Sequence, residues 1–206
     1  MRIAVFGATG GTGRQIVSQA LSAGYQVQAL VRDPTRLMIK HPDLTIIQGD
    51  VLEITKVAET VEDTEAVICS LGNTANNPDM VVSRGTGHII EAMKAKARPR
   101  RLITVTSLGV GDSRDQVPAI FKMLIKTVLR KPLRDKEVQE KIIRDSGLDW
   151  IIVRPGGLTD NPATGNYRFG VDPTIVAKQV SRADVAAFVL RQLTDDTFLH
   201  QTPAIT

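Results

Sequence analysis

Short runs of apolar residues alternate along the chain with longer segments in which apolar residues recur every three or four positions. The short runs are typical of buried β-strands, and the longer period is typical of helices with one buried face. We expect strands over residues 3–6, 27–31, 44–48, 66–70, 102–106 and 150–153, with a short one over 167–171. We expect helices over residues 11–23, 53–61, 80–97, 118–129, 135–146 and 183–193. Gly24 and Gly147 follow two of these helices, where a left-handed residue commonly ends a helix, and Ser181 is expected to cap the last one.

The strand-like runs are apolar throughout, and helical segments separate them. This pattern predicts a parallel sheet covered by helices on both faces. The handedness of crossover connections then gives a doubly wound, Rossmann-type α/β fold with a ligand crevice at the carboxyl ends of the strands. The 206 residues suit one such domain, spanning 1–206, with a short C-terminal extension after Pro155.

A glycine-rich turn joins the first expected strand to the first expected helix. Its sequence is Gly-Ala-Thr-Gly-Gly-Thr-Gly over residues 7–13. In this context Gly7 allows the tight turn, Gly10 lets the backbone approach a pyrophosphate, and Gly13 permits close packing of helix on strand. Amides at the helix N-terminus would then meet the phosphate oxygens of a dinucleotide.

The end of the second expected strand bears on the choice of cofactor. Sites that prefer NAD carry an acidic residue there, whereas this chain has Arg32, followed by Arg36. Both guanidinium groups suit the 2′-phosphate of NADPH. Asp33 would favour NADH if the alignment shifted by one residue, but Pro34 holds Asp33 extended before an immediate turn and is expected to point it away. We therefore expect NADPH.

Further residues at strand ends face the same expected crevice. Asp50 and Val51 follow the third strand and could bracket the adenine, and Leu71 and Gly72 follow the fourth and could lie against the ribose. The fifth strand ends in hydroxyl residues, Thr106 and Ser107, near the expected position of the nicotinamide. Ser107 is a candidate for orienting the carboxamide or the substrate; the alternative is an ordinary turn serine.

Composition narrows the classes of partner. Aromatic residues make up 4% of the chain, too few for stacking on nucleic acid, and one cysteine, Cys69, with three dispersed histidines predicts neither a disulfide nor a metal site. The first strand begins at once, which leaves no room for a signal peptide, so we expect a cytoplasmic protein. The net charge of +4 and the basic clusters over 94–101 and 122–134 are interpreted as solvated helix faces. We expect a monomer that takes a small-molecule substrate and binds neither nucleic acid nor membrane.

One absence constrains the chemistry. Dehydrogenases of this fold that reduce carbonyls usually transfer the proton with a Tyr-x-x-x-Lys pair. Here Tyr25 is followed four residues later by Ala29, and Tyr167 by Val171. Carbonyl reduction with a tyrosine acid is therefore disfavoured.

Six tracts together resemble the atypical short-chain dehydrogenase/reductases over nearly the whole chain. These tracts are residues 7–13, 30–33, 49–51, 146–149, 153–158 and 181–186. The compact length, the tract 92–95 and the Thr106-Ser107 strand end look most like flavin reductase and biliverdin-IXβ reductase. The resemblance implies hydride transfer from NADPH to a flat conjugated acceptor, either a flavin bound as substrate rather than as a prosthetic group or a linear tetrapyrrole. Such a reaction needs little acid–base machinery, because positioning two flat rings does most of the work.

The resemblance also implies site residues. Cofactor-binding positions carry over to Gly7, Thr9, Gly10, Gly11, Thr12, Gly13, Arg32, Arg36, Asp50, Val51, Leu71, Gly72 and Thr106, with Pro155 and Leu158 beside the nicotinamide. Ser107 matches the proposed catalytic serine, and Lys136 matches a lysine of the broader group. The acceptor pocket would be formed by residues 107–135 and 155–180, where residues 109–112 and Gly157 replace bulkier groups and so open it.

Several alternatives stay open on the sequence. Lys136 either points inward, toward a carboxylate or the ribose, or lies on the helix surface. The basic helix expected at 118–130 either packs on the body, closes as a lid over the acceptor, or meets a membrane or partner. The protein could also act on another metabolite as a reductase or isomerase, or be a catalytically silent NADP(H) sensor or scaffold.

Overall fold

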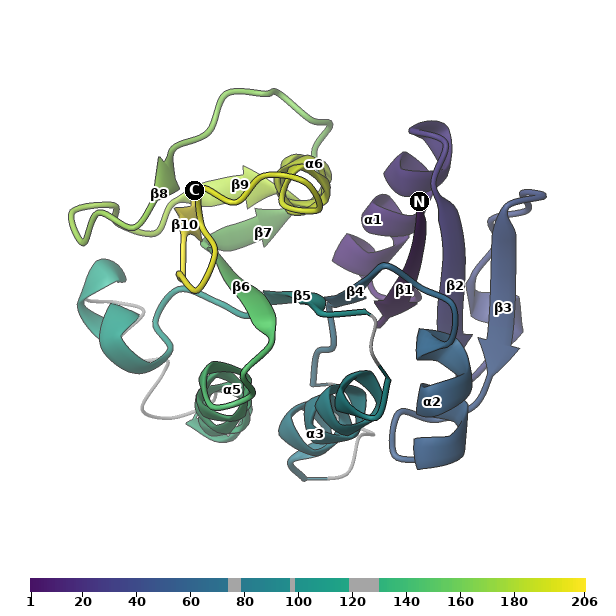
Figure 1. Cartoon of the computed structure of the whole chain (residues 1–206). Coiled ribbons are helices and arrows are strands. Elements are labelled where there is room, and N and C mark those ends of the chain that lie inside the picture. The colour runs from purple at the N-terminus through teal and green to yellow at the C-terminus, as the bar shows by residue number, and fades with distance from the viewer. Residues whose placement is uncertain (74–78, 97–98, 119–129) are drawn as a thin grey trace.

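Parallel strands form the centre of the molecule in the computed structural model, which describes residues 1–73, 79–96, 99–118 and 130–206 (Figure 1). The strands are β1 Arg2–Phe6, β2 Gln26–Val31, β3 Leu44–Gln48, β4 Ala66–Cys69, β5 Arg101–Val105, β6 Asp149–Pro155, β7 Gly157–Thr159, β8 Phe169–Gly170, β9 Gln179–Ser181 and β10 Ala204–Ile205. The helices are α1 Gly11–Ser22, α2 Ile54–Val61, α3 Val81–Lys94, α5 Arg130–Arg144 and α6 Arg182–Arg191, with short 3-10 helices at Pro34–Arg36 (η1) and Gly111–Gln116 (η2).

The order of strands in the main sheet is β3-β2-β1-β4-β5-β6-β10-β8. All neighbours from β3 to β10 run parallel, and β8 pairs antiparallel with β10. The order reverses on either side of β1, so the crevice of a doubly wound sheet lies at the carboxyl ends of β1 and β4. The predicted single-domain, Rossmann-type α/β fold is confirmed.

Two apolar cores, one on each face of the sheet, explain why the strands are apolar throughout. Side chains of successive strand residues point to opposite faces. Ile3 and Val5 of β1 pack under α1 and α6, whereas Ala4 and Phe6 pack under α2 and α3. Figure 1 shows α1 and α6 on one side of the sheet and α2, α3 and α5 on the other.

Most predicted elements are present, with shifted ends. The helix predicted over 80–97 is α3, which begins one residue later because Met80 has φ of 59°, outside the helical region. The helix predicted over 135–146 extends back to Arg130, since Pro132 lies in its first turn, where proline is tolerated. The helix predicted over 118–129 falls almost wholly outside the described residues.

The sixth strand was predicted to end at Val153, but β6 continues to Pro155, and Arg154 within it is buried. The strand predicted over 167–171 is only Phe169–Gly170, and the short strands β7, β9 and β10 were not predicted. Two- and three-residue strands carry too little periodicity to be recognised.

The C-terminal extension packs onto the Rossmann body. Ser181 caps α6 as predicted, because its side chain accepts a hydrogen bond from the amide of Asp184. Helix α6 lies against α1, where the Gln19 side chain donates to the carbonyl of Ala183 at 3.0 Å. Among the helices that the structure describes, none is long and apolar enough to cross a membrane.

Candidate functional site

A cavity of about 620 Å³ lies at the carboxyl ends of the parallel strands. It is lined by residues that directly follow five of them, Gly7 after β1, Arg32 after β2, Gly49 after β3, Ser70 after β4 and Thr106 after β5. Strand ends of a parallel sheet meet at one edge, so residues far apart in the chain share this cavity. The cavity occupies the position where a doubly wound sheet binds its ligand.

The glycine turn forms one wall of the cavity, and its geometry requires glycine at two positions. Gly7 has φ of +82°, and a side chain there would come within 2.5 Å of the Ser70 carbonyl oxygen. A Cβ atom on Gly13 would overlap the carbonyl oxygen of Gly7. The turn therefore lets α1 begin directly against β1, with its first amides directed at the cavity. No acidic residue occupies the first turn of α1.

Arg32 and Arg36 lie at the β2 end of the cavity. Arg32 is half exposed, and its guanidinium lies 3.8 Å from the Asp50 carboxylate. Asp33 turns away from the cavity, as predicted. Its carboxylate accepts hydrogen bonds from the backbone and hydroxyl groups of Thr35, which also lower its pKa. The two arginines are the basic groups available here for a 2′-phosphate.

Asp50, which comes after β3, and Leu71, which comes after β4, also line the cavity. The Asp50 carboxylate accepts a hydrogen bond from the amide of Leu52 at 2.8 Å, which fixes the turn after β3. Side chains from Val51 and Leu71 meet beside Gly85 of α3, where any side chain on Gly85 would collide with them. This wall is apolar and close-packed, and it suits the face of an adenine or a ribose.

Thr106, Ser107, Lys136 and Leu158 lie at the β5 end of the cavity. The Ser107 hydroxyl donates to the carbonyl of Leu108 at 3.0 Å, so the residue lines the cavity and also satisfies a turn. Leu158 belongs to β7 and is partly exposed. These four residues come from three separate parts of the chain, and they share the cavity with the glycine turn.

Lys136 points inward, which resolves the alternatives that the sequence left open. Its ammonium lies 3.4 Å from the carbonyl oxygen of Val105, and burial lowers its pKa. The nearby charges of Cys69, Glu140 and Asp135 act in the opposite direction on that pKa. A partly buried ammonium with a lowered pKa at a cavity wall is typical of a functional lysine.

Cys69 lies behind this wall at the end of β4. Its thiol lies 3.7 Å from the Thr86 hydroxyl and 3.7 Å from the Gln139 side-chain amide. Burial raises the pKa of the thiol. The carboxylate of Asp135, next to Lys136, accepts hydrogen bonds from the first amides of α3, Val82 and Ser83. Helices α3 and α5 are thereby joined behind the cavity.

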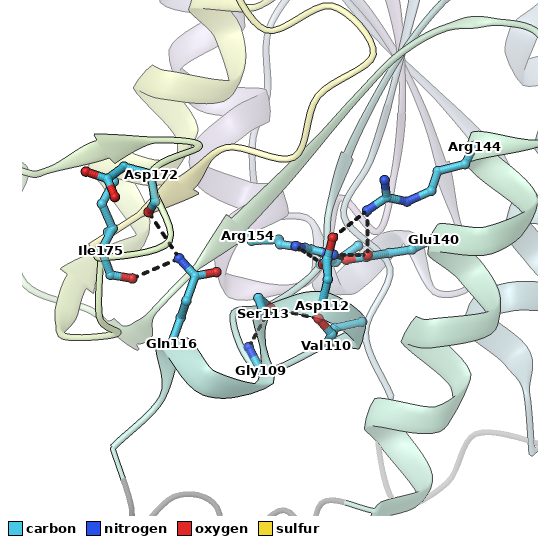
Figure 2. Close-up of polar contacts among 11 residues, drawn as sticks. Gly109, Val110, Asp112, Ser113, Gln116, Glu140, Arg144, Arg154, Asp172 and Ile175 are labelled. Carbon is cyan, nitrogen blue, oxygen red and sulfur yellow. Dashed lines mark hydrogen bonds and ion pairs between the residues drawn. The ribbon is translucent and has the colours of Figure 1, made fainter.

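A buried ion-pair network supports the β5 end (Figure 2). Glu140 accepts hydrogen bonds from the Thr106 hydroxyl at 2.7 Å and from two guanidinium nitrogens of Arg154 at 3.0 and 2.5 Å. Glu140 and Arg154 have side chains only 5% and 4% exposed. Asp112 of η2, which is 68% exposed, closes the network by pairing with Arg154 at 2.5 Å and with Arg144 at 3.6 Å. The network thus joins β6, α5 and the loop after Ser107.

That loop is also tied to the C-terminal extension. The Gln116 side-chain amide donates to the carbonyl of Ile175 at 3.0 Å and, more weakly, to that of Asp172 at 3.3 Å (Figure 2). In return, Ala177 donates its amide to the Gln116 carbonyl at 2.7 Å. Residues on either side of the predicted acceptor pocket are therefore in direct contact.

All of the predicted site residues except Pro155 line the cavity. Pro155 ends β6, and its carbonyl accepts a hydrogen bond from the amide of Leu108 at 2.9 Å. Of the segments predicted to form the acceptor pocket, Ser107 and Leu158 line the cavity. Residues 109–112 and Gly157 are not among the residues that line this cavity: Asp112 pairs with Arg154, and Gly157 pairs with β9. The expectation that they open the acceptor pocket stays a prediction. The roles of the predicted residues stay predictions.

Several lining residues were not predicted, and Arg182 is the most informative of them. The others are Phe6, Leu30, Val31, Gly49, Ser70, Asn73, Val81 and Val105. Arg182 comes from the start of α6 and reaches the glycine turn. Arg182 is far from that turn in the sequence, so no local pattern could link the two. It belongs to the tract 181–186, but the resemblance assigned no role to that tract.

The charges of the cavity lining favour an anionic ligand. Among the lining residues that the structure describes, Arg32, Arg36, Lys136 and Arg182 are basic, and Asp50 is acidic. The phosphates of a dinucleotide fit this lining for three reasons: the glycine turn leaves room for them, a helix N-terminus attracts them, and cations are in excess. The hydroxyl and ammonium groups at the β5 end fit polar groups of a second ligand.

Comparisons with known proteins agree with this geometry. Residues 7–196 match the model of a family described as NAD(P)H-binding. An uncharacterized chloroplastic protein of Arabidopsis thaliana is 34% identical over 204 residues, covering 93% of this chain and 71% of that protein. Reductase pytE of Aspergillus terreus is 27% identical over 238 residues, covering 93% of this chain and 90% of the reductase. The solved structure of ChuY, an anaerobillin reductase of Escherichia coli O157:H7, has a TM-score of 0.83 and 26% identity, covering 100% of this chain and 96% of that one.

Proposed function

The chain belongs to the NAD(P)H-binding family, and we propose that it is an oxidoreductase that transfers hydride from NADPH to a flat conjugated acceptor, either a flavin or a linear tetrapyrrole. One observation carries the proposal. A single cavity is lined both by the glycine turn and by Ser107 with the partly buried Lys136. The reductase names of two similar proteins support the class of reaction.

In this proposal the cofactor end of the cavity selects NADPH. The glycine turn and the first amides of α1 bind the diphosphate, and Arg32 and Arg36 bind the 2′-phosphate. Val51 and Leu71 pack against the adenosine. NADPH, when bound, supplies the hydride, and every one of these residues acts by binding and orienting.

The acceptor end positions the second ring system. Ser107 orients the nicotinamide or the acceptor through its hydroxyl, and the Lys136 ammonium binds an anionic or carbonyl group of the acceptor. A conjugated acceptor takes up the hydride into its own ring system, so no tyrosine acid is needed, and the accompanying proton comes from the Lys136 ammonium or from water. Catalysis is then mostly the positioning of two flat rings.

The flavin in this proposal is a substrate that dissociates after reduction and not a resident group. We further propose that the protein works as a monomer in the cytoplasm on small molecules, without a nucleic-acid or membrane partner. These parts are carried by the sequence expectations alone and stay predictions.

A direct assay tests the proposed function. Purified protein is mixed with NADPH or NADH and then with FMN or biliverdin, and the nicotinamide absorbance is followed. We expect turnover with at least one acceptor and faster turnover with NADPH than with NADH. Tight NADPH binding without turnover of either acceptor would overturn the proposal and favour an NADP(H) sensor.

A further inference from the structure

Arg182 extends from the first residue of α6 across the glycine turn. Its side chain lines the cavity and is about one quarter exposed. Its Cδ and Nε atoms lie 2.7 Å from the position that a Cβ atom would take on Gly11, the first residue of α1. The Arg182 side chain therefore lies against the first residue of α1, and both residues line the cavity.

Gly11 indicates that this placement is built into the sequence. The backbone at Gly11 does not adopt the positive φ that favours glycine, unlike that at Gly7. The three nearest atoms that a Cβ on Gly11 would meet all belong to the Arg182 side chain. A larger residue at this position would therefore push that side chain away from the turn.

The position of Arg182 in its own helix does not explain the residue. A cation in the first turn of a helix is unfavourable, because the helix dipole is positive there. The capping of α6 comes instead from Ser181 and Asp184, whose carboxylate also accepts from the amides of Thr164 and Gly165. A basic residue at this position therefore does not stabilise α6. It lies against the N-terminus of α1, which also attracts anions.

In the structure the anion beside Arg182 is Asp160. The guanidinium pairs with this carboxylate at 2.8 Å, and Asp160 is 87% exposed. An ion pair with one partner this exposed is weak and readily exchanged. Asp160 therefore neutralises Arg182 without burying it, and a stronger anion in the cavity can replace the carboxylate.

We propose that Arg182 binds the diphosphate of the dinucleotide across the glycine turn and that Asp160 competes with the diphosphate for its guanidinium. The inference rests on the proposed function, since it assigns one more residue to the same cofactor. It also separates two anion sites: Arg182 recognises the diphosphate that NADPH and NADH share, whereas Arg32 and Arg36 recognise the 2′-phosphate.

Calorimetric titration of ligand fragments tests this assignment. The ligands are NADPH, NADH, ADP-ribose, which retains the diphosphate, and adenosine 2′-monophosphate, which lacks it. We expect Arg182→Ala to weaken the first three alike, by about tenfold or more as for a lost charge-assisted hydrogen bond, and to leave the fourth unchanged. We expect Asp160→Asn to tighten binding of the first three by about two- to fivefold, because it removes a weak competitor.

Two further variants guard against a merely structural effect. Arg191→Ala removes another arginine from α6 that is ion-paired with an aspartate, Asp195, and should leave all four affinities unchanged. Gly11→Ala pushes the Arg182 side chain away and should weaken the same three ligands, with no additional loss when combined with Arg182→Ala. Thermal melting checks that each variant is folded.

The failures are distinguishable. Unchanged ADP-ribose affinity in Arg182→Ala, or equal loss for adenosine 2′-monophosphate, would overturn the role of Arg182 and leave the proposed function intact. Weaker ADP-ribose binding in Asp160→Asn would overturn the competition. Absence of NADPH binding by the wild-type protein would overturn the proposed function and this inference together.

Discussion

The two ends of the cavity are built in different ways. At the glycine end the lining consists of the backbone of the glycine turn and of three arginines, Arg32 and Arg36 near the start of the chain and Arg182 from α6. At the Lys136 end the lining includes the buried Thr106 and the partly buried Lys136 of α5. The Thr106 hydroxyl donates to Glu140, which belongs to a network of buried charges that joins α5 to β6. The first end can bind a ligand with little effect on folding, whereas the second end contributes to the fold itself.

This difference teaches where function and stability are coupled. Arg32 is half exposed, so its removal leaves no buried group without a partner. Arg154 and Glu140 are almost fully buried, so the removal of either leaves an uncompensated charge in the protein interior. Substitutions at the two ends should therefore separate cleanly in their effects on ligand binding and on unfolding.

The largest effect is expected for Arg154→Met. We expect the free energy of unfolding to fall by about 3–5 kcal/mol, because the Glu140 carboxylate loses its buried partner. Urea unfolding measures this change. The paired substitution of Glu140→Leu with Arg154→Met should recover most of the loss, since two apolar groups of similar size leave no charge unpaired. If Arg154→Met alone were as stable as the wild type, the Lys136 end would not contribute to stability as we infer.

The next largest effect is expected at the glycine end, and it concerns ligand binding and not stability. We expect Arg32→Ala with Arg36→Ala to weaken NADPH binding by about 100-fold, as two charge-assisted contacts are lost, while NADH binding and the unfolding free energy stay unchanged. Titration of nicotinamide fluorescence measures both affinities. Lys40→Ala, an exposed basic residue of the same loop outside the cavity, is the control. Equal losses for NADPH and NADH would contradict the assignment of the 2′-phosphate.

The smallest effect concerns Lys136→Met, where function and stability should move in opposite directions. We expect kcat/KM for the acceptor to fall by about tenfold, since one charged hydrogen bond is lost. The wild-type rate should decline as the pH rises through the pKa of Lys136, which burial places below the usual lysine value, and the variant should lack this decline.

The same variant should be more stable than the wild type. Because the pKa of Lys136 is lowered, the unfolded chain binds more protons than the folded one between the folded and unfolded pKa values. The cost of burying the ammonium is thus greatest below that range and is relieved as the pH rises through it, and methionine removes it altogether. Lys141→Met, on the exposed face of the same helix, should change neither the rate profile nor the stability. A melting temperature lowered by Lys136→Met would contradict this account.

The sequence predicts the glycine end of the cavity better than the Lys136 end. The glycine turn, Arg32 and the capping of α6 by Ser181 depend on neighbouring residues, and local patterns reveal them. The predicted sixth strand stops before Arg154, whereas β6 includes it. The partner that makes this buried charge acceptable, Glu140, lies on another element and is not visible from neighbouring residues.

Arg182 was missed for a related reason. Its contact with Gly11 joins residues at opposite ends of the chain, and no periodicity or motif reports such a contact. Lys136 could be named from the resemblance, but its direction could not, because the choice between cavity and surface depends on how α5 rotates against β5. Sequence patterns therefore revealed the binding turn and most of the lining, and the structure supplied the long-range pairings.

Cys69 gives the Lys136 end a consequence of practical value. It is the chain's single cysteine, and it lies buried between β4 and the helices α3 and α5 with a pKa raised by burial. A thiol reagent can therefore react only when those helices part from the sheet, and no other thiol contributes to the signal. The chain thus carries its own probe of local opening, and the labelling rate with and without NADPH would report how strongly a ligand at one end of the cavity restrains the packing at the other.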